Sequence, residues 1–173
     1  MKKCLAIFFS IFVVVFLSAC SNESVNVKED LDIKELVHEY SVVDFENLSA
    51  SITSNELIIT NEGDNQKAYS LPSDEFFVSI APFINTTHEC AIHSLTGCQG
   101  ELVEKNFSVS IKDEKGNVIL DKEIQSLKNG FIDLWLPRDQ TFNVEIKYEG
   151  KTANGEISTF EGDNTCITTM QLI

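Results

Sequence analysis

Positive charge is scarce in this sequence. Only 13 lysine and arginine residues stand against 27 aspartate and glutamate residues, which gives a formal net charge of −14, and Arg138 is the only arginine. A nucleic-acid partner requires a basic surface that neutralises phosphates, and this composition cannot supply one. We therefore expect no nucleic-acid partner, and the same acidity disfavours direct attraction to anionic lipid headgroups.

The sequence also lacks internal repeats, low-complexity tracts and an apolar run long enough to span a membrane in the usual way. Its one long apolar run, residues 5–19, is shorter than the about 20 residues that a transmembrane helix needs. The run follows two lysines and ends in Leu17-Ser18-Ala19-Cys20, which resembles the lipobox of bacterial lipoproteins. These features predict a signal peptide over residues 1–19 and lipidation of Cys20. The alternative is an ordinary secretory signal with a chance cysteine.

The predicted mature chain is acidic and extracytoplasmic. Residues 1–19 contain two lysines and no acidic residue, so the remainder carries 11 basic against 27 acidic residues. Because this charge cannot hold the chain on an anionic membrane, we expect the lipid on Cys20 to be the anchor. Residues 20–30 are polar and aperiodic, and we interpret them as a tether between the lipid and the fold.

Cysteine is also scarce, with five in the whole chain. Cys4 would leave with the signal peptide and Cys20 would carry lipid, which leaves Cys90, Cys98 and Cys166. Three thiols cannot all be closed in intramolecular disulfides. At least one is therefore left for a metal, for redox chemistry or for an intermolecular bridge.

Hydrophobic periodicity predicts a mostly β fold in two parts. Residues 30–86 are predicted to form a small α+β unit, with a short helix, a hairpin and a strand that ends near Pro82. Residues 87–173, which include the three cysteines, are predicted to form an antiparallel β-sandwich. Apolar residues alternate strictly there, as in 107–111 and 142–148, between turns rich in Gly, Asp and Asn. The order of these strands is similar to prealbumin-like sandwich modules, a likeness that concerns the scaffold only.

The segment THECAIHSLTGCQG, residues 87–100, carries the clearest chemical signal. Cys90 and His93 lie three residues apart, so a helical turn or a tight loop would place them on one side. The segment favours a loop that folds Cys98 back toward Cys90, and Cys166 follows a turn where such a loop can reach it. Soft Cu(I) accepts two or three thiolates with a nearby imidazole, so these residues suit it.

Other interpretations of the same residues stay open. A structural disulfide between two of the three cysteines would make the chain a stapled surface module for protein interactions. A Cys3His zinc site usually pairs cysteines two to four residues apart, whereas seven residues separate Cys90 from Cys98. A catalytic Cys–His pair would also need an orienting group and an oxyanion hole, and no signature of either is present.

Several neighbouring residues are interpreted without a firm metal role. His88 is interpreted as an ordinary loop or surface residue, and His93 as either a loop residue or a ligand. Met170 is four residues beyond Cys166, which is about 13 Å along a strand, so we interpret it as core. The turn at residues 161–164 matches no ordered calcium loop.

Four stretches of the sequence resemble the CueP family of extracytoplasmic copper-binding proteins: THECAIHSLTGCQGELV, NGFIDLWLPRDQTF, STFEGDNTCITTMQL and EFFVSIAPFI. The resemblance covers about residues 35–173. It implies a two-part fold that binds copper through Cys90, Cys98 and Cys166, with His93 as a neighbour. It also implies a role in copper resistance and thiol-dependent reduction of Cu(II) to Cu(I), in which two thiols close a disulfide.

We therefore predict a lipid-anchored, extracytoplasmic protein that holds Cu(I) and reduces Cu(II). It would act as a buffer or carrier in copper homeostasis rather than as a turnover enzyme. Its expected partners are copper ions, the membrane lipid and a protein that accepts the copper. The lipid anchor departs from family members in two-membrane bacteria, which are periplasmic.

Overall fold

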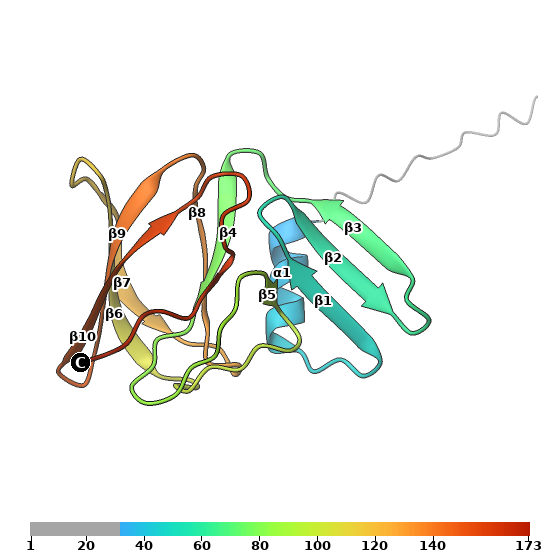
Figure 1. The fold of residues 1–173 in the computed structure, drawn as a ribbon, viewed down its shortest axis with the longest axis horizontal. Helices are drawn as coiled ribbons and strands as arrows, with labels where there is room; N and C mark the ends of the chain where they lie inside the picture. The colour runs from blue at the N-terminus through green and yellow to red at the C-terminus, as the bar shows by residue number, and fades with distance from the viewer. Residues whose placement is uncertain (1–31) are drawn as a thin grey trace, which may run out of the picture. The chain divides into compact units, whose positions relative to one another are not determined.

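The computed structural model describes residues 32–173. The predicted signal peptide, the predicted lipidation site Cys20 and the predicted tether of residues 20–30 lie outside the described residues. Within the described range the chain forms one α-helix and eleven β-strands (Figure 1). That range contains no helix with the length and hydropathy needed to cross a membrane.

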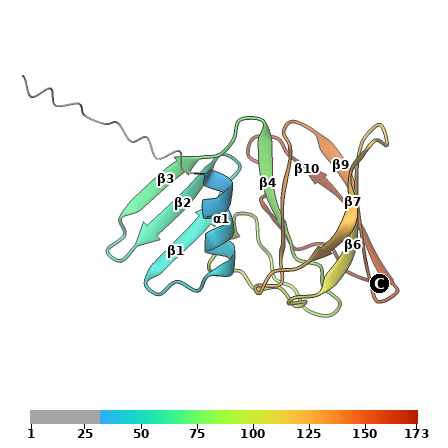
Figure 2. The same cartoon turned by 180° about the vertical axis from the view of Figure 1, so that it is seen from behind.

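The N-terminal part is a four-stranded sheet with one helix on it, in the strand order β3-β2-β1-β5. Helix α1 (Ile33–Val42) begins at Asp32, whose carboxylate accepts hydrogen bonds from two backbone N–H groups of the first turn. Figure 2 shows α1 lying against the sheet. The strands of this sheet are β1 (Leu48–Ile52), β2 (Glu56–Asn61), β3 (Gln66–Ser70) and β5 (His93–Ser94). The predicted helix and the hairpin formed by β2 and β3 are confirmed.

The C-terminal part is the predicted sandwich. An antiparallel sheet in the order β10-β9-β6-β7 faces a three-stranded sheet in the order β11-β4-β8. The alternating residues of β6 and β9 point inward as predicted, and Phe107, Ile111 and Phe142 are fully buried. The strand bounds are β4 (Glu75–Ile80), β6 (Asn106–Asp113), β7 (Val118–Gln125), β8 (Ile132–Pro137), β9 (Thr141–Tyr148), β10 (Lys151–Ser158) and β11 (Cys166–Ile167).

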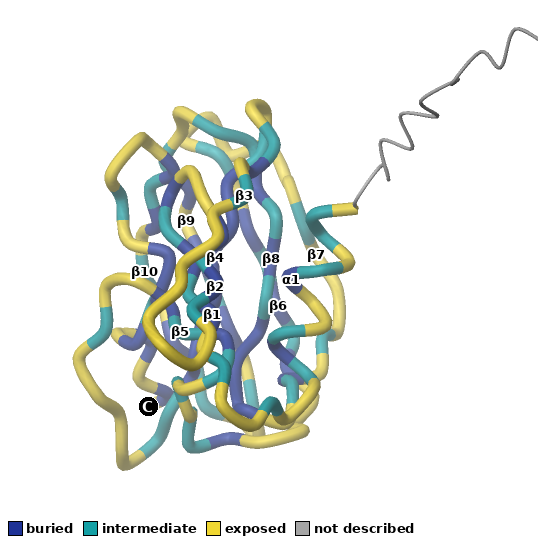
Figure 3. Tube along the Cα trace, turned by 90° about the vertical axis from the view of Figure 1, so that its right-hand side faces the viewer, coloured by how far each residue is buried: buried dark blue, intermediate teal, exposed yellow. Residues whose placement is uncertain are grey.

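Strands β4 and β8 form a wall between two hydrophobic cores and contribute side chains to both. Phe76 and Val78 contribute to the sandwich core, whereas Phe77 and Trp135 pack with the residues beneath α1. Figure 3 shows β4 and β8 buried while the edge strand β3 is exposed. β4 lies within residues 30–86, the range predicted for the α+β unit, yet its partners are β8 and β11. A strand that is apolar on both faces does not reveal its partners by periodicity.

The end of the chain departs from the predicted final strand. β11 is only two residues long and pairs in parallel with β4, with Cys166 opposite Ser79. The chain then continues irregularly, with one isolated bridge between Phe83 and Gln171. Met170 is buried in the sandwich core, as predicted. The short β11 therefore serves mainly to place Cys166 beside β4.

Candidate metal centre

Cys90 and Cys98 lie on the connection between β4 and β6, which carries the short strand β5. β5 pairs with β1, with His93 opposite Ile52. After β5 the chain turns, and the N–H of Cys98 donates to the carbonyl of Ser94 at 3.0 Å. This turn brings the Sγ atoms of Cys90 and Cys98 to 3.5 Å from each other. The predicted loop that returns Cys98 toward Cys90 is therefore confirmed.

Cys166 reaches the same place from the last part of the chain. The N–H groups of Thr165 and Cys166 both donate to the carbonyl of Ala91, at 3.0 Å and 3.1 Å. The Cys166 side chain is buried with Phe131, and the half-buried Cys90 and Cys98 pack against this small cluster. Backbone hydrogen bonds thus join Cys166 directly to the loop that carries the other two thiols.

Four donor atoms converge here, and we call them the donor cluster. They are the Sγ atoms of Cys90, Cys98 and Cys166 and one ring nitrogen of His88, all within 4.8 Å of one another. Two sulfurs bound to a common ion at about 2.3 Å are at most about 4.6 Å apart. The cluster therefore needs only small movements to close on one metal ion. The three cysteines are free thiols.

His88 belongs to the donor cluster, although its sequence context was interpreted as ordinary loop. One signal that points to it is its position two residues before Cys90, because an extended segment places residues i and i+2 on one side. His93 is fully buried, with its ring 4.5 Å from the ring of Phe131. Neither ring nitrogen of His93 has a hydrogen-bond partner within residues 32–173.

The three thiols have unequal acidity. The neighbouring Cys166 thiol is the main cause that lowers the pKa of Cys98 well below its usual value. The nearby rings of His93 and His88 act in the same direction. The contact with Cys98, together with burial, raises the pKa of Cys166. Burial is the main cause that raises the pKa of Cys90. The lowered pKa favours the thiolate form at Cys98 over the other two cysteines, and the thiolate is the form that binds metal ions.

A buried hydroxyl ties the donor cluster to the N-terminal sheet. The Thr165 hydroxyl donates to the carbonyl of Ile52 at 2.6 Å and accepts from the N–H of His93 at 3.0 Å. The Thr165 carbonyl accepts from the N–H of Ser79 on β4 at 2.8 Å. One residue next to Cys166 thus bonds β1, β4 and β5, and this fixes the relative position of the two segments that carry the thiols.

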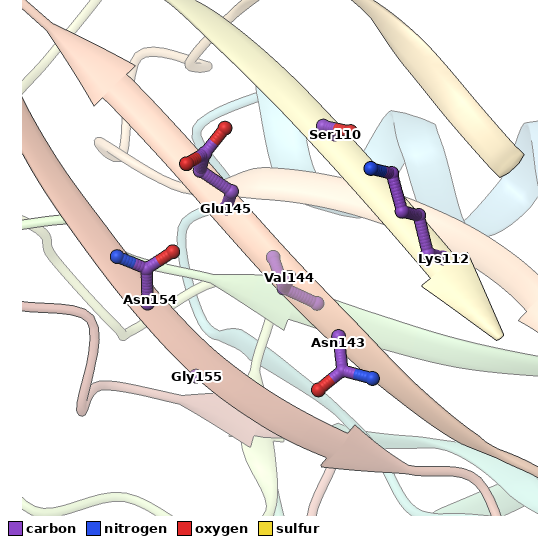
Figure 4. Close-up of a pocket in the computed structure, with 7 residues that line it drawn as sticks. All are labelled: Ser110, Lys112, Asn143, Val144, Glu145, Asn154 and Gly155. Atoms are coloured by element: carbon purple, nitrogen blue, oxygen red, sulfur yellow. The ribbon is translucent and has the colours of Figure 1, made fainter. Parts of the chain in front are cut away.

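Two cavities of the molecule differ in chemistry. One of about 460 Å³ opens on the outer face of β6, β9 and β10. Figure 4 shows that its lining side chains are mainly polar and that none belongs to the donor cluster. The other, of about 340 Å³, has Cys90 and Cys166 in its wall. Cys90 and Cys166 are therefore accessible from the second cavity, whereas Cys98 is not part of its wall.

Comparisons with known proteins agree with this geometry. The family described as "Periplasmic copper-binding protein CueP" matches residues 18–171. The crystal structure of S.CueP is similar to this structure, with a TM-score of 0.77 and 41% sequence identity. That likeness covers 82% of this chain and 88% of the other. No curated protein matches the sequence. The chain therefore belongs to the CueP family of periplasmic copper-binding proteins.

Proposed function

We propose that this chain holds one Cu(I) ion through the thiolates of Cys90, Cys98 and Cys166, with His88 as an additional donor. The observation that carries the proposal is the convergence of these four donor atoms within 4.8 Å from two distant segments. His93, the histidine named from the sequence, lies beside the cluster with its ring against Phe131 and is not one of the four converging donors.

The donor set favours copper in its reduced state. Cu(I) is soft and is satisfied by two or three thiolates, and no carboxylate belongs to the four-atom donor cluster. Three cysteines and one histidine also match a tetrahedral zinc site. Removing one donor distinguishes the two metals. Cu(I) retains affinity when one of the four donors is missing, whereas a structural zinc site depends on all four.

The first experiment titrates the reduced mature protein with Cu(I) against a chromophoric Cu(I) chelator. We expect one tightly held Cu(I) per chain and loss of this binding in the Cys90→Ser/Cys98→Ser/Cys166→Ser variant. His88→Gln should weaken binding, and His38→Gln on α1 is the matched control. Unchanged Cu(I) retention by the triple variant would refute the proposal.

A second function is supported by the closeness of two thiols. Cys90 and Cys98, with sulfurs 3.5 Å apart, can close a disulfide and release two electrons, together with whatever protons the two sulfurs still carry. These electrons reduce two Cu(II) ions to two Cu(I), while Cys166 remains as a thiol that retains one of them. We expect two Cu(I) ions in a bathocuproine trap for each disulfide formed. Copper held as Cu(II) with all thiols intact would argue against this step.

The proposed location and partners rest on sequence features. Cys20 would carry the lipid anchor, and a protein that accepts the Cu(I) would complete the pathway. Mass spectrometry of the membrane fraction should show a diacylated N-terminus that is absent from Cys20→Ser. Mass spectra of the same protein, taken with and without copper, also test the alternative function as a disulfide-stapled interaction module. A reduction-resistant disulfide that forms regardless of metal, with no copper retained, would favour the stapled interaction module.

A further inference from the structure

We propose that the 340 Å³ cavity beside the thiols, here called the entry cavity, receives hydrated Cu(II) through the carboxylates of Glu156 and Asp163. This inference rests on the proposed function, because it assigns the route by which the copper substrate reaches Cys90 and Cys166. The entry cavity would provide oxygen donors next to a donor cluster that is made mainly of sulfur.

The wall of the entry cavity combines oxygen donors with two of the three thiols. The lining residues are Cys90, Glu156, Ile157, Ser158, Gly162, Asp163, Asn164, Cys166, Ile167, Thr168 and Thr169. Oxygen atoms of carboxylates, hydroxyls and an amide are the main polar groups, and no lysine, arginine or histidine lines the cavity. Cys90 and Cys166 therefore share a cavity with groups that are negatively charged and rich in oxygen.

The carboxylates of Glu156 and Asp163 differ in their hydrogen bonding. Glu156 is exposed and makes no side-chain hydrogen bond or ion pair within residues 32–173. Asp163 accepts the N–H of Phe160 at 2.8 Å through one oxygen, which leaves its other oxygen free. Because no cationic side chain lines the cavity, both charges act on an incoming cation, and such focusing raises association rates.

The cavity arises from the way the chain leaves the sandwich. β10 is the edge strand of its sheet, and the C-terminal residue bonds to it at Thr152. β11 does not continue this pairing, because it pairs with β4 instead. The segment 166–169 therefore diverges from the edge of β10 at residues 156–158, and the entry cavity lies between them.

The two oxidation states of copper prefer the two kinds of donor atom found in the entry cavity. Cu(II) is the harder ion and is well served by carboxylate and other oxygen donors, whereas Cu(I) prefers thiolates. An ion that arrives as hydrated Cu(II) would exchange water for oxygen atoms of the cavity wall and would be held by sulfur after reduction. The carboxylates are thus expected to affect the rate of arrival and not the final affinity for Cu(I).

The test compares two double variants that remove the same charges. Glu156→Gln/Asp163→Asn neutralises the cavity, and the Asn side chain can still accept the N–H of Phe160. Glu62→Gln/Asp64→Asn does the same in the exposed turn between β2 and β3. Reduced protein is mixed with Cu(II), and the second-order rate of Cu(I)-thiolate formation is followed by absorbance. We expect the cavity variant to be about 3- to 10-fold slower at low ionic strength, and the control to change less than about 2-fold.

Two further measurements separate this inference from the proposed function. Affinity for Cu(I), measured by chelator competition, should be unchanged in the cavity variant. Without copper, the thiols are labelled with a trimethylammonium methanethiosulfonate and with its neutral methyl analogue. The ratio of cationic to neutral labelling should fall in the cavity variant and stay constant in the control. Equal ratios and equal Cu(II) rates in both double variants would overturn the inference while leaving Cu(I) binding intact.

Discussion

Cys98 occupies the most electrostatically favourable position among the three thiols. Its Sγ atom lies 3.5 Å from that of Cys90, and the Cys166 thiol and the rings of His88 and His93 are close by. These neighbours lower the pKa of Cys98, whereas the pKa of the buried Cys166 is raised. Metal binding would therefore start from one existing thiolate and displace the remaining protons.

The lowered pKa of Cys98 predicts its reactivity with pH. Thiolate is the reactive form, and an ordinary thiol has a pKa of about 8.5. In the copper-free protein we expect Cys98 to react with iodoacetamide near pH 6, well ahead of Cys90 and Cys166. Tandem mass spectrometry of the peptide that contains Cys90 and Cys98 distinguishes the two sites. Preferential labelling of Cys166 at this pH would contradict the prediction.

The sign of the linked stability follows from the same shift. A thiol whose pKa is lower in the folded state than in the unfolded state stabilises the fold. This contribution is complete above the pKa of the unfolded thiol, and it is lost as pH falls through the pKa of the folded state. The contribution of Cys98 to the stability of the copper-free fold therefore grows as pH rises toward the pKa of the unfolded thiol. Above that value, the raised pKa values of Cys166 and Cys90 act in the opposite direction.

Thr165 is the second residue whose substitution gives a sharp prediction. Thr165→Val keeps the side-chain volume but leaves the carbonyl of Ile52 and the N–H of His93 buried without this partner. We expect a loss of about 1–3 kcal/mol in the free energy of unfolding, measured in urea. Cu(I) affinity should fall about 10-fold or more, because supporting hydrogen bonds orient metal ligands. Thr165→Ser retains the hydroxyl and should restore the affinity; an unchanged affinity in Thr165→Val would show that the hydroxyl has no positioning role.

At the scale of elements, the loop from β4 to β6 is held by a close contact with the turn before β8. The N–H of Gly100 donates to the carbonyl of Asn129 at 2.6 Å. A Cβ atom on Gly100 would lie 2.7 Å from the carbonyl oxygen of Gly130, and backbone cannot yield as a flexible side chain does. This contact keeps the end of the cysteine loop next to Phe131, against which Cys166 packs.

Gly100→Ala is therefore expected to displace the loop. Because the new methyl group meets backbone, the loop must move away from the turn, and the spacing of Cys98 to Cys166 must change. We expect a destabilisation of about 1–3 kcal/mol together with weaker Cu(I) binding. Gly116→Ala is the control: its Cβ would meet nothing within 4 Å, so it adds only the strain of a positive φ of 83°. Equal Cu(I) affinity in both variants would contradict the predicted displacement.

At the scale of the whole molecule, the donor cluster joins parts of the chain that are far apart in sequence. One group of donors comes from the connection after β4, and Cys166 comes from β11 near the C-terminus. Both are held against the β11-β4-β8 sheet, which is also the wall shared by the two cores. A metal ion that binds all these donors at once binds the folded state more tightly than the unfolded chain and therefore stabilises the fold.

Copper should therefore raise the unfolding temperature. Free Cu(I) at about 1,000 times its dissociation constant contributes about 4 kcal/mol, which for a chain of this size corresponds to roughly 10 °C. Differential scanning calorimetry of the reduced protein under anaerobic conditions measures the shift. The Cys90→Ser/Cys98→Ser/Cys166→Ser variant should show no shift, and an equal shift in the variant would mean that copper binds elsewhere.

The sequence by itself determined the local structure and the identity of the thiols. Apolar residues alternate with polar residues in β6 and β9. This pattern indicates a half-buried strand, because neighbouring side chains in a strand point to opposite faces. The helix at Ile33–Val42 and the hairpin of β2 and β3 follow from similarly local signals. The motif around Cys90 and Cys98, with Cys166, was sufficient to indicate the CueP family.

Only the tertiary structure decided which side chains meet. It placed His88 rather than His93 in the four-atom donor cluster, because β5 turns the ring of His93 into the core beside Phe131. It assigned β4 to β8 and β11, and this pairing brings Cys166 to the loop. Such contacts depend on how all the sheets pack together, and a local pattern of residues carries no information about a partner many residues away.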